Sequence, residues 1–294
     1  MNPYNSHQSL LDTPHGDHVH TPSSPPPKST NPDAPPSVSD LILRLLLISS
    51  FATLAIWANH EASKSFSITI INDAGKHSLP GKRFSIFYQS NDAATRIVLN
   101  TSRFVEHLLY PSYDHQGLQH MKKHINSVTL RLAPIKLPSI VHVSSQKPGE
   151  YVIILSPSIM GEACSHKTDE FVLAVLKGMA RVWLWDGNGA VPEVVLNGMV
   201  EYITYLAGFR TTFMLLENIK MNCWEDEDPK KVAGFLKFYD HGGGDGEVIR
   251  RLNDGMKDKW DDEMVGDAVG VRGQHACASY DKLTTNHHYQ ASSM

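Results

Sequence analysis

One stretch near the N-terminus limits the folds open to this chain more than any other feature. Residues 41–58 read LILRLLLISSFATLAIWA and carry a single charge, Arg44. A helix of that length spans about 27 Å, close to the hydrocarbon thickness of a bilayer. Arg44 can reach the polar interface with its long side chain, and Trp57 suits the opposite interface. The stretch from Leu41 to Ala58 therefore predicts a single transmembrane helix.

Two other interpretations of this stretch are weaker. A cleaved signal peptide begins close to the N-terminus, whereas this apolar run begins after about 40 residues of polar leader. A buried core helix usually has one polar face, and this stretch is apolar on all sides. Positive charges are too few on either side to orient the helix, with Lys28 before it and Lys64 after it.

The remaining chain divides into a leader, one domain and a tail. Residues 1–40 are rich in Pro, Ser and His and are predicted to be disordered, as is the polar tail 284–294. Residues 65–283 are enough for one domain with its own core. The formal net charge is −4 and no basic stripe is present, so nucleic acid is not an expected partner.

Two modification chemistries are open in this domain. Asn100 begins an Asn-Thr-Ser sequon, which is a glycosylation candidate if the domain faces the lumen or the cell exterior. That is the localisation we expect, for a single-pass membrane protein. The three cysteines, Cys164, Cys223 and Cys277, do not form a disulfide framework. One bridge with one free thiol and three thiols without a bridge both remain open.

The pattern of residues predicts a mixed α+β domain with a small N-terminal sheet and a mostly helical C-terminal half. Alternating or β-branched residues predict strands at 65–71, 83–88, 127–132 and 151–155. Helices are predicted at 91–109, 168–185, 191–207, 230–239 and 246–259. The glycine-rich segment 242–246 is a connector without the Lys-Ser/Thr of a phosphate loop, and Asp245 is expected near the N-cap of the helix that follows.

The helices predicted at 168–185 and 191–207 carry the question of function. In the first helix Lys177 and Arg181 are four residues apart on the polar side, so they are neighbours. Asn197 and Glu201 have the same spacing in the second helix. A turn with the sequence WDGNG separates the two helices, and Pro192 suits the first turn of the second one.

This helix pair resembles the plant basic secretory protein family. The stretch VLKGMARVWLWDGNGAVPEVVLNGMVEYITYLAG, residues 175–208, is similar to the family's helix, its V-W-x-W-N-G-N-G turn and its second helix with E-G-x-A-D-Y. The resemblance extends over roughly residues 65–283. It implies a zincin-like metallohydrolase fold and an association with plant defence.

The departures from the family pattern fall on the positions that would hold zinc. Where the family has the first His, the Glu and the second His of H-E-x-x-H, this chain has Lys177, Gly178 and Arg181. Asn197 and Glu201 stand where the family has a Glu and an acidic residue in the second helix. Ammonium and guanidinium groups have no lone pair for a metal, and glycine has no carboxylate to act as a base. We therefore expect no zinc and no cofactor.

Two hypotheses concern what replaced the metal and what the domain does. In the first, Lys177 and Arg181 pair with Glu201 and Glu193 across the helix pair; alternatively, both cations face water. In the second, the domain acts in binding or scaffolding, with the membrane and an unknown protein or peptide as partners. A peptidase or hydrolase with a non-standard metal set is the alternative function, and a drifting copy without a retained role is a third.

Overall fold

A computed structural model describes residues 38–62, 66–111, 121–161, 167–210, 224, 228–240, 245–272 and 275–280 of the chain. The chain divides into two compact units, Met1–Ala58 and Asn59–Met294. Residues 1–37 of the predicted disordered leader and the predicted disordered tail 284–294 lie outside the described residues. Residues 38–40, which the sequence also assigns to the leader, instead form the start of a helix. The predicted domain boundaries stay predictions.

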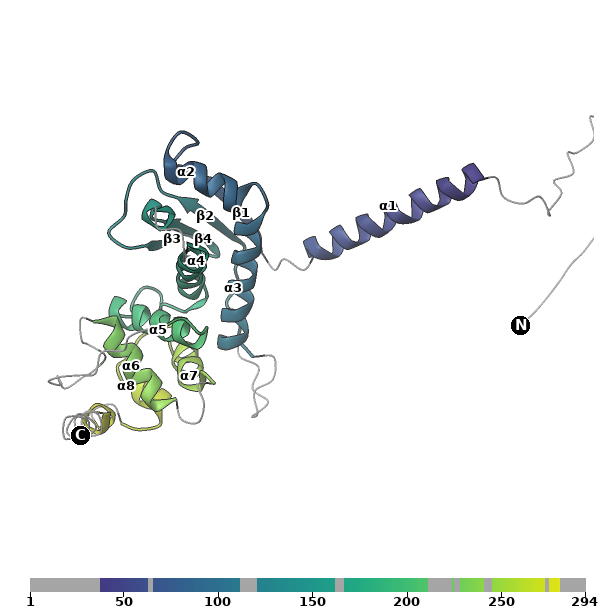
Figure 1. Ribbon diagram of the computed structural model, residues 1–294. Helices are drawn as coiled ribbons and strands as arrows, with labels where there is room; N and C mark the ends of the chain where they lie inside the picture. Colours follow the sequence, from purple (N-terminus) through teal and green to yellow (C-terminus); the bar gives the residue numbers. More distant parts are fainter. Residues whose placement is uncertain are drawn as a thin grey trace, which may run out of the picture. The chain divides into compact units, whose positions relative to one another are not determined.

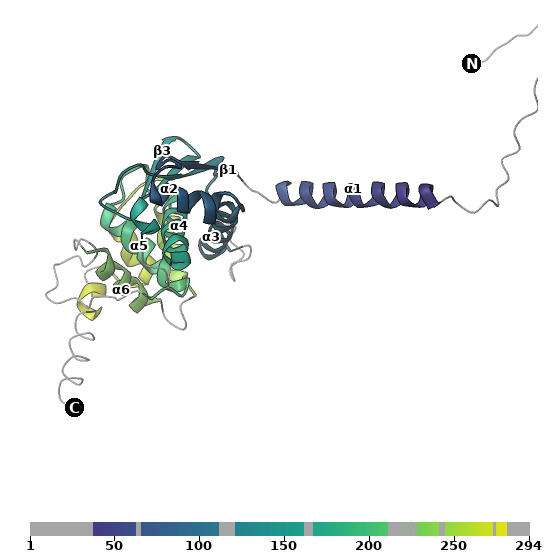
Figure 2. The same ribbon diagram turned by 45° about the horizontal axis from the view of Figure 1, so that its top comes forward.

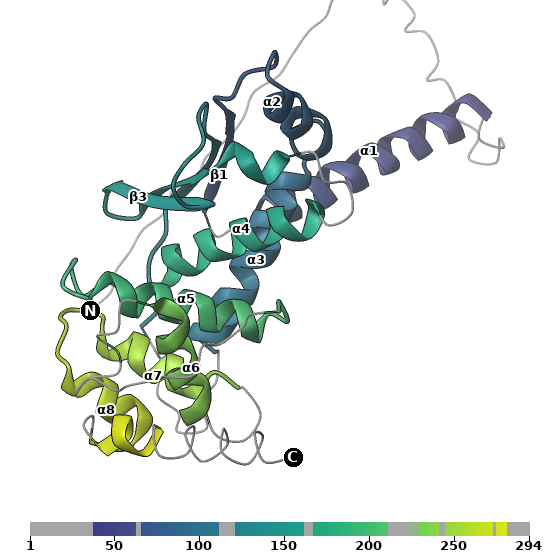
Figure 3. The same cartoon turned by 60° about the vertical axis from the view of Figure 1, so that its left-hand side comes forward.

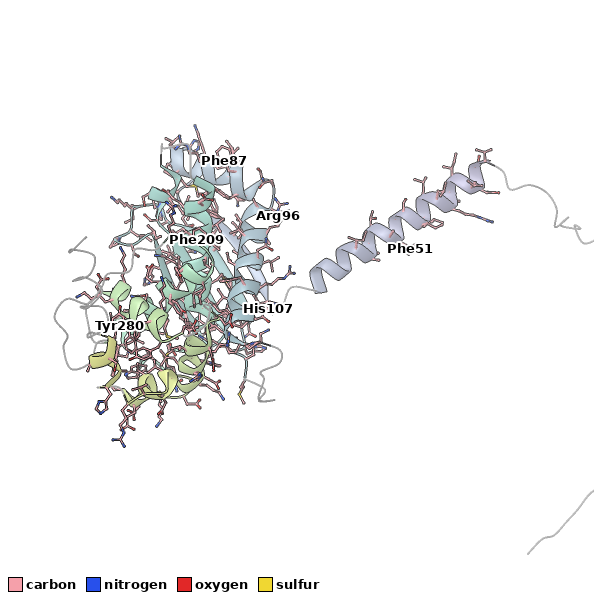
Figure 4. The ribbon with its side chains drawn as sticks, turned by 60° about the horizontal axis from the view of Figure 1, so that its bottom comes forward. Phe51, Phe87, Arg96, His107, Phe209 and Tyr280 are labelled. Atoms are coloured by element: carbon pink, nitrogen blue, oxygen red, sulfur yellow. The ribbon has the colours of Figure 1, made fainter. Side chains whose placement is uncertain are left out.

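The apolar stretch forms the long helix α1, Val38–Ala62 (Figure 1). Its part Val38–Ile56 has a mean hydropathy of 1.8 and is long and apolar enough to cross a membrane. Every side chain described in that part is exposed, and Phe51 is 67% exposed (Figure 4). This exposure contradicts the buried-core interpretation, because a core helix would be covered by the rest of the chain.

The domain begins with one four-stranded sheet in the order β1-β2-β4-β3. Its strands are β1 Ser67–Asn72, β2 Ser127–Leu132, β3 Val141–Lys147 and β4 Glu150–Leu155. The pairs β1–β2 and β2–β4 are parallel, and β3 is an antiparallel edge strand. In β2 the alternation is complete, since Val128, Leu130 and Leu132 are fully buried. The mostly polar segment of β3, VHVSSQK, has no counterpart among the predicted strands.

The strand predicted at 83–88 is wrong. These residues belong to the helix α2, Leu79–Phe84, and to a π-helical turn, η1, Ser85–Gln89. The Ser78 hydroxyl accepts a hydrogen bond from the Gly81 N–H at 3.0 Å and so begins α2. Phe84 and Tyr88, four residues apart, are both buried, and Tyr88 stacks on Phe171 with ring centroids 3.8 Å apart. Burial at helical spacing thus overrides the strand-like run of residue types.

The helices of the domain lie largely where the sequence predicts them. They are α3 Ala93–Leu109, α4 Lys167–Trp183, α5 Glu193–Leu206, α6 Pro229–Tyr239, α7 Glu247–Gly255 and, unpredicted, α8 Glu263–Val269. Helix α4 packs against β3, β4, α3 and α5 (Figure 2). It lies between the sheet and the C-terminal helices (Figure 3). The mixed α+β class, with a small N-terminal sheet and a helical C-terminal half, is confirmed.

Cys277 in the C-terminal helical turn is disulfide-bonded and buried. This favours the one-bridge alternative over three thiols without a bridge. Cys164 and Cys223, the other cysteines, lie outside the described residues.

A single carboxylate, Asp240, organises the start of α7. Its side chain accepts hydrogen bonds from the backbone N–H groups of Gly246 at 2.8 Å and Glu247 at 3.0 Å. It also accepts one from the Tyr202 hydroxyl at 2.5 Å. Burial and this bond raise the pKa of the Tyr202 phenol. Asp245 lies next to the N-cap residue Gly246, as predicted, but the side-chain acceptor for the first N–H groups of α7 is Asp240 at the end of α6.

We expect Asp240→Asn to lower the free energy of unfolding by about 1–3 kcal/mol, because a buried charged acceptor of three donors becomes a neutral amide. Urea unfolding of the detergent-solubilised chain measures the change. Asp245→Asn is the matched control, since Asp245 is exposed and near the same helix end, and we expect less than about 0.5 kcal/mol there. Equal losses in the two variants would contradict the role of Asp240.

Candidate functional site

Helix α4 carries the candidate site because its two sides differ sharply. Phe171, Val175 and Met179 are fully buried between the sheet and the other helices. Lys177 and Arg181 are only partly covered, with side chains 19% and 23% exposed. The apolar side of α4 is packed in the core. Because this sets the position of the helix, it also places Lys177 and Arg181 beside α5.

The two cations pair with carboxylates of α5, which confirms the pairing hypothesis. Lys177 Nζ lies 2.5 Å from Glu201 Oε1, and both side chains are 19% exposed. Arg181 pairs with Glu193 in the first turn of α5, a position where a carboxylate also suits the helix dipole. Asn197 donates a weaker hydrogen bond to Glu193 at 3.3 Å. The helix pair is therefore joined by two ion pairs. Lys177, Arg181 and Glu201 are positions that the sequence resemblance assigns to the degenerate metal site, and this assignment stays a prediction.

Gly178 lies directly beneath the sheet. A Cβ at this position would be 2.6 Å from Cγ2 and 3.1 Å from Cδ1 of Ile153, a fully buried residue of β4. Real Cβ atoms do not approach another carbon that closely, so the glycine allows α4 to pack tightly against β4. Position 178, to which the sequence resemblance assigns the family's Glu, is thus closed by an apolar contact.

The turn after α4 is held in place by α7 and by the segment between α7 and α8. Gly187, Asn188 and Gly189 all have positive φ, and a Cβ on Gly187 would be 2.9 Å from the backbone of Lys259. Asn188 Nδ2 donates to the Asp258 carbonyl at 2.9 Å. The Trp185 N–H donates to Asn253 Oδ1 at 3.0 Å. These contacts explain why the turn needs its glycines independently of any metal.

Lys123 is a functional candidate that sequence reasoning missed. Its ammonium is buried, donates to the Leu184 carbonyl at the end of α4 at 2.5 Å, and lies over the rings of Tyr151 and Trp185 at 5.1 and 5.4 Å. Burial lowers the pKa of Lys123 to about 8, opposed by Asp186 and assisted by Arg181. No sequence pattern around residue 123 predicts this, because all of its partners come from distant segments.

The lowered pKa of Lys123 predicts the direction in which the free energy of unfolding changes with pH. Between pH 8 and 10.5 the unfolded state binds the proton that the folded state has released, so stability rises with pH across this window. We expect the stability of the wild type relative to Lys123→Met to rise by up to about 3 kcal/mol from pH 7.5 to 10.5. Urea unfolding of both proteins at several pH values measures this, and a difference that is flat or falls with pH would contradict it.

The end of α4 is rich in donors that lack acceptors. Arg181 Nη1 and Trp185 Nε1 are buried and have no hydrogen-bond partner in the structure. A zinc site needs the opposite, several lone pairs directed at one point. Within the residues that the structure describes, no group of three or more His, Cys, Asp or Glu side chains could hold a metal ion. Lys177, Gly178 and Arg181 do not fit zinc by their own chemistry.

The glycosylation candidate, Asn100, lies on the exposed side of α3. Ser102 of the same sequon is buried and accepts a hydrogen bond from Trp183 Nε1 at 2.9 Å. Asn100 is thus accessible to a glycan, while the Ser102 hydroxyl of its sequon is a hydrogen-bond acceptor in the core. Glycosylation of Asn100 stays a prediction.

The comparisons with known proteins agree with the resemblance seen in the sequence. The family model described as peptidase of plants and bacteria, BSP, matches residues 63–280. The comparisons with curated proteins and with solved structures gave no match. Since the matched residues make up well over half of the chain, the chain belongs to the basic secretory protein family of plant and bacterial peptidases.

Proposed function

We propose that this protein is a membrane-tethered, non-catalytic member of its peptidase family that binds a protein or peptide ligand. The observation that carries the proposal is the pair of salt bridges, Lys177–Glu201 and Arg181–Glu193, at the positions of the family's metal motif. The cations neutralise carboxylates there, and neither cation has a lone pair to offer a metal. Without a bound metal, and without a base at position 178, no group in this proposal activates the water that hydrolysis needs.

The tether and the compartment have separate support. Helix α1 has the length and composition of a membrane span. The disulfide at Cys277 suits a domain that faces an oxidising compartment, the lumen or the cell exterior. The accessible Asn100 sequon suits the same side of the membrane. In this proposal the domain presents its α4–α5 surface to ligands outside the cytosol, and a role in plant defence is one setting for it.

Metal analysis and peptide hydrolysis test the loss of catalysis. The purified full chain and a family member that keeps H-E-x-x-H are dialysed together against trace zinc, and both are offered a mixture of peptides. We expect zinc near one equivalent, and cleavage, only in the relative. Stoichiometric zinc in this chain, with cleavage that a chelator abolishes, would contradict the proposal.

Binding is tested on a peptide array probed with the full chain. Spots that bind the wild type and lose the signal with Arg181→Gln support a ligand at the α4–α5 surface. Glu247→Gln is the control, since Glu247 is exposed on α7. An array on which the wild type binds no peptide above background would contradict a peptide ligand.

A peptidase with a non-standard metal set is the second candidate, and membership of a peptidase family is the observation that favours it. This alternative needs ligands other than Lys177 and Arg181. Metal-dependent cleavage that survives Glu201→Gln would place those ligands elsewhere in the chain.

A further inference from the structure

Exposed apolar side chains gather in two segments of the domain. Seven large hydrophobic residues are exposed in the described part of residues 59–294, and five of them lie in segments 73–91 and 133–140. We call these five the apolar patch: Leu79, Ile86, Phe87, Ile135 and Ile140. Ile86, Phe87 and Ile135 are each about 60–70% exposed. Scattered single residues of this kind are common, but such a concentration marks an interaction surface.

The two segments lie at one end of the sheet, where the parallel strands end. The Asp73 N–H bonds to the Leu132 carbonyl, which joins the ends of β1 and β2. The Ser156 N–H bonds to the Ile140 carbonyl, which holds the second segment beside the end of β4. Arg83 of α2 donates to the Met160 carbonyl at 2.9 Å, just beyond that same strand end. Figure 4 shows Phe87 at the surface, away from Phe209 and Tyr280.

The exposure of Ile86 and Phe87 follows from the backbone conformation of η1. In this π-helical turn Tyr88 is buried against Phe171, and the turn directs Ile86 and Phe87 outward. A single π-helical turn in a helix, such as η1 directly after α2, is uncommon and often marks a functional site. The chain thus fixes two adjacent large apolar side chains in water, which is unfavourable unless something covers them.

The charge around the patch is positive. Lys76, Lys82 and Lys136 are exposed in the same two segments. The single carboxylate of these segments, Asp73, already faces Arg131 Nε at 2.9 Å. Apolar side chains among lysines are the composition of surfaces that bind anionic membranes, with the apolar groups entering the interface and the lysines meeting lipid phosphates.

We propose that the apolar patch docks the domain onto an anionic lipid surface. The inference rests on the tether of the proposed function, because the ten residues between Ile56 and Ser67 keep the start of β1 within about 35 Å of the membrane span. A tethered patch meets the bilayer at high effective concentration, so modest affinity suffices. A docked domain would hold its α4–α5 surface in a fixed orientation toward ligands.

Tryptophan quenching in vesicles tests the docking. The full chain with Phe87→Trp is reconstituted in vesicles of phosphatidylcholine and phosphatidylserine whose acyl chains are brominated, and the wild-type emission is subtracted. We expect the emission of the new tryptophan to fall by on the order of twofold. Met121→Trp is the matched control, an exposed apolar position outside the patch, and its emission should stay constant. Each Lys→Glu change at positions 76, 82 and 136 should lower the docked-to-undocked ratio at least about fivefold.

The two experiments test the docking of the patch and the membrane anchor separately. An unquenched tryptophan at position 87, or equal quenching at position 121, overturns the docking. Alkaline extraction of the same vesicles reports the tether separately: release of the chain contradicts the proposed anchor, whereas a retained but unquenched chain contradicts the patch alone.

Discussion

Gly178→Glu, a change toward the H-E-x-x-H pattern that the sequence resembles, is expected to lower the free energy of unfolding by about 3 kcal/mol or more. The Cβ alone would lie 2.6 Å from Ile153 Cγ2, and Ile153 is fully buried and stiff about its first side-chain torsion. Helix α4 must move away from β4, and a carboxylate then enters an apolar contact. Urea unfolding of the detergent-solubilised chain measures the loss.

Gly178→Ala separates the steric part of this effect from the charge. A gain of about 1 kcal/mol from helix propensity opposes an overpacking cost of about 1–3 kcal/mol, so the net loss should be about 0–2 kcal/mol. Gly255→Ala in α7 is the matched control, because its added Cβ would meet Met264 at 3.7 Å or more, and it should be neutral or stabilising. Stabilisation by Gly178→Ala equal to that of Gly255→Ala would contradict the close contact.

A second substitution, at Ile153, tests directly whether residues 153 and 178 compete for the same space. Ile153→Ala removes the three carbons that crowd position 178, at a cavity cost of about 2–5 kcal/mol in the wild type. In the Gly178→Ala background part of that cavity is filled, so the double variant should be more stable than the sum of the single losses predicts, by about 1 kcal/mol. Strict additivity would show that the two residues do not share space.

Breaking the Lys177–Glu201 pair is also expected to destabilise the domain. Lys177→Met leaves the Glu201 carboxylate without its cation while four fifths of its side chain remain covered. Removal of one partner of a buried pair costs about 3–5 kcal/mol, and partial exposure reduces this to about 2 kcal/mol. Glu201→Gln keeps an acceptor for the lysine and should cost about 1 kcal/mol.

The double variant Lys177→Met/Glu201→Leu tests whether the pair itself stabilises the domain. Apolar groups of similar volume often match or exceed a buried ion pair, so we expect this variant to be within about 1 kcal/mol of the wild type. Glu247→Gln is the control for the loss of an exposed pair, Arg251–Glu247, and should change stability by less than about 0.5 kcal/mol. If Lys177→Met also stayed within that limit, the pair would be a surface contact only.

Sequence alone predicted the elements whose signals are local. The apolar run of α1, the periodicity of α3 to α7 and the alternation of β2 are all properties of neighbouring residues. The pairing of Lys177 and Arg181 with Glu201 and Glu193 was also predictable, because side chains four residues apart share one helix face and the short turn brings the two helices together. The segment 83–88 was not, since its strand-like residues are buried at helical spacing.

Tertiary structure alone decided the features that join distant segments. Ile153 closes position 178, Asp240 caps α7, and Lys123 lies buried against the end of α4. Each depends on which residue of another element lies within a few ångströms, and a local pattern does not record that. The sequence by itself determined that this chain has an apolar span and a helix pair with Lys177, Gly178 and Arg181 at the positions of the H-E-x-x-H pattern that it resembles. The packing of the sheet on α4 determined how tightly position 178 is closed, because close packing leaves no room for even one added carbon.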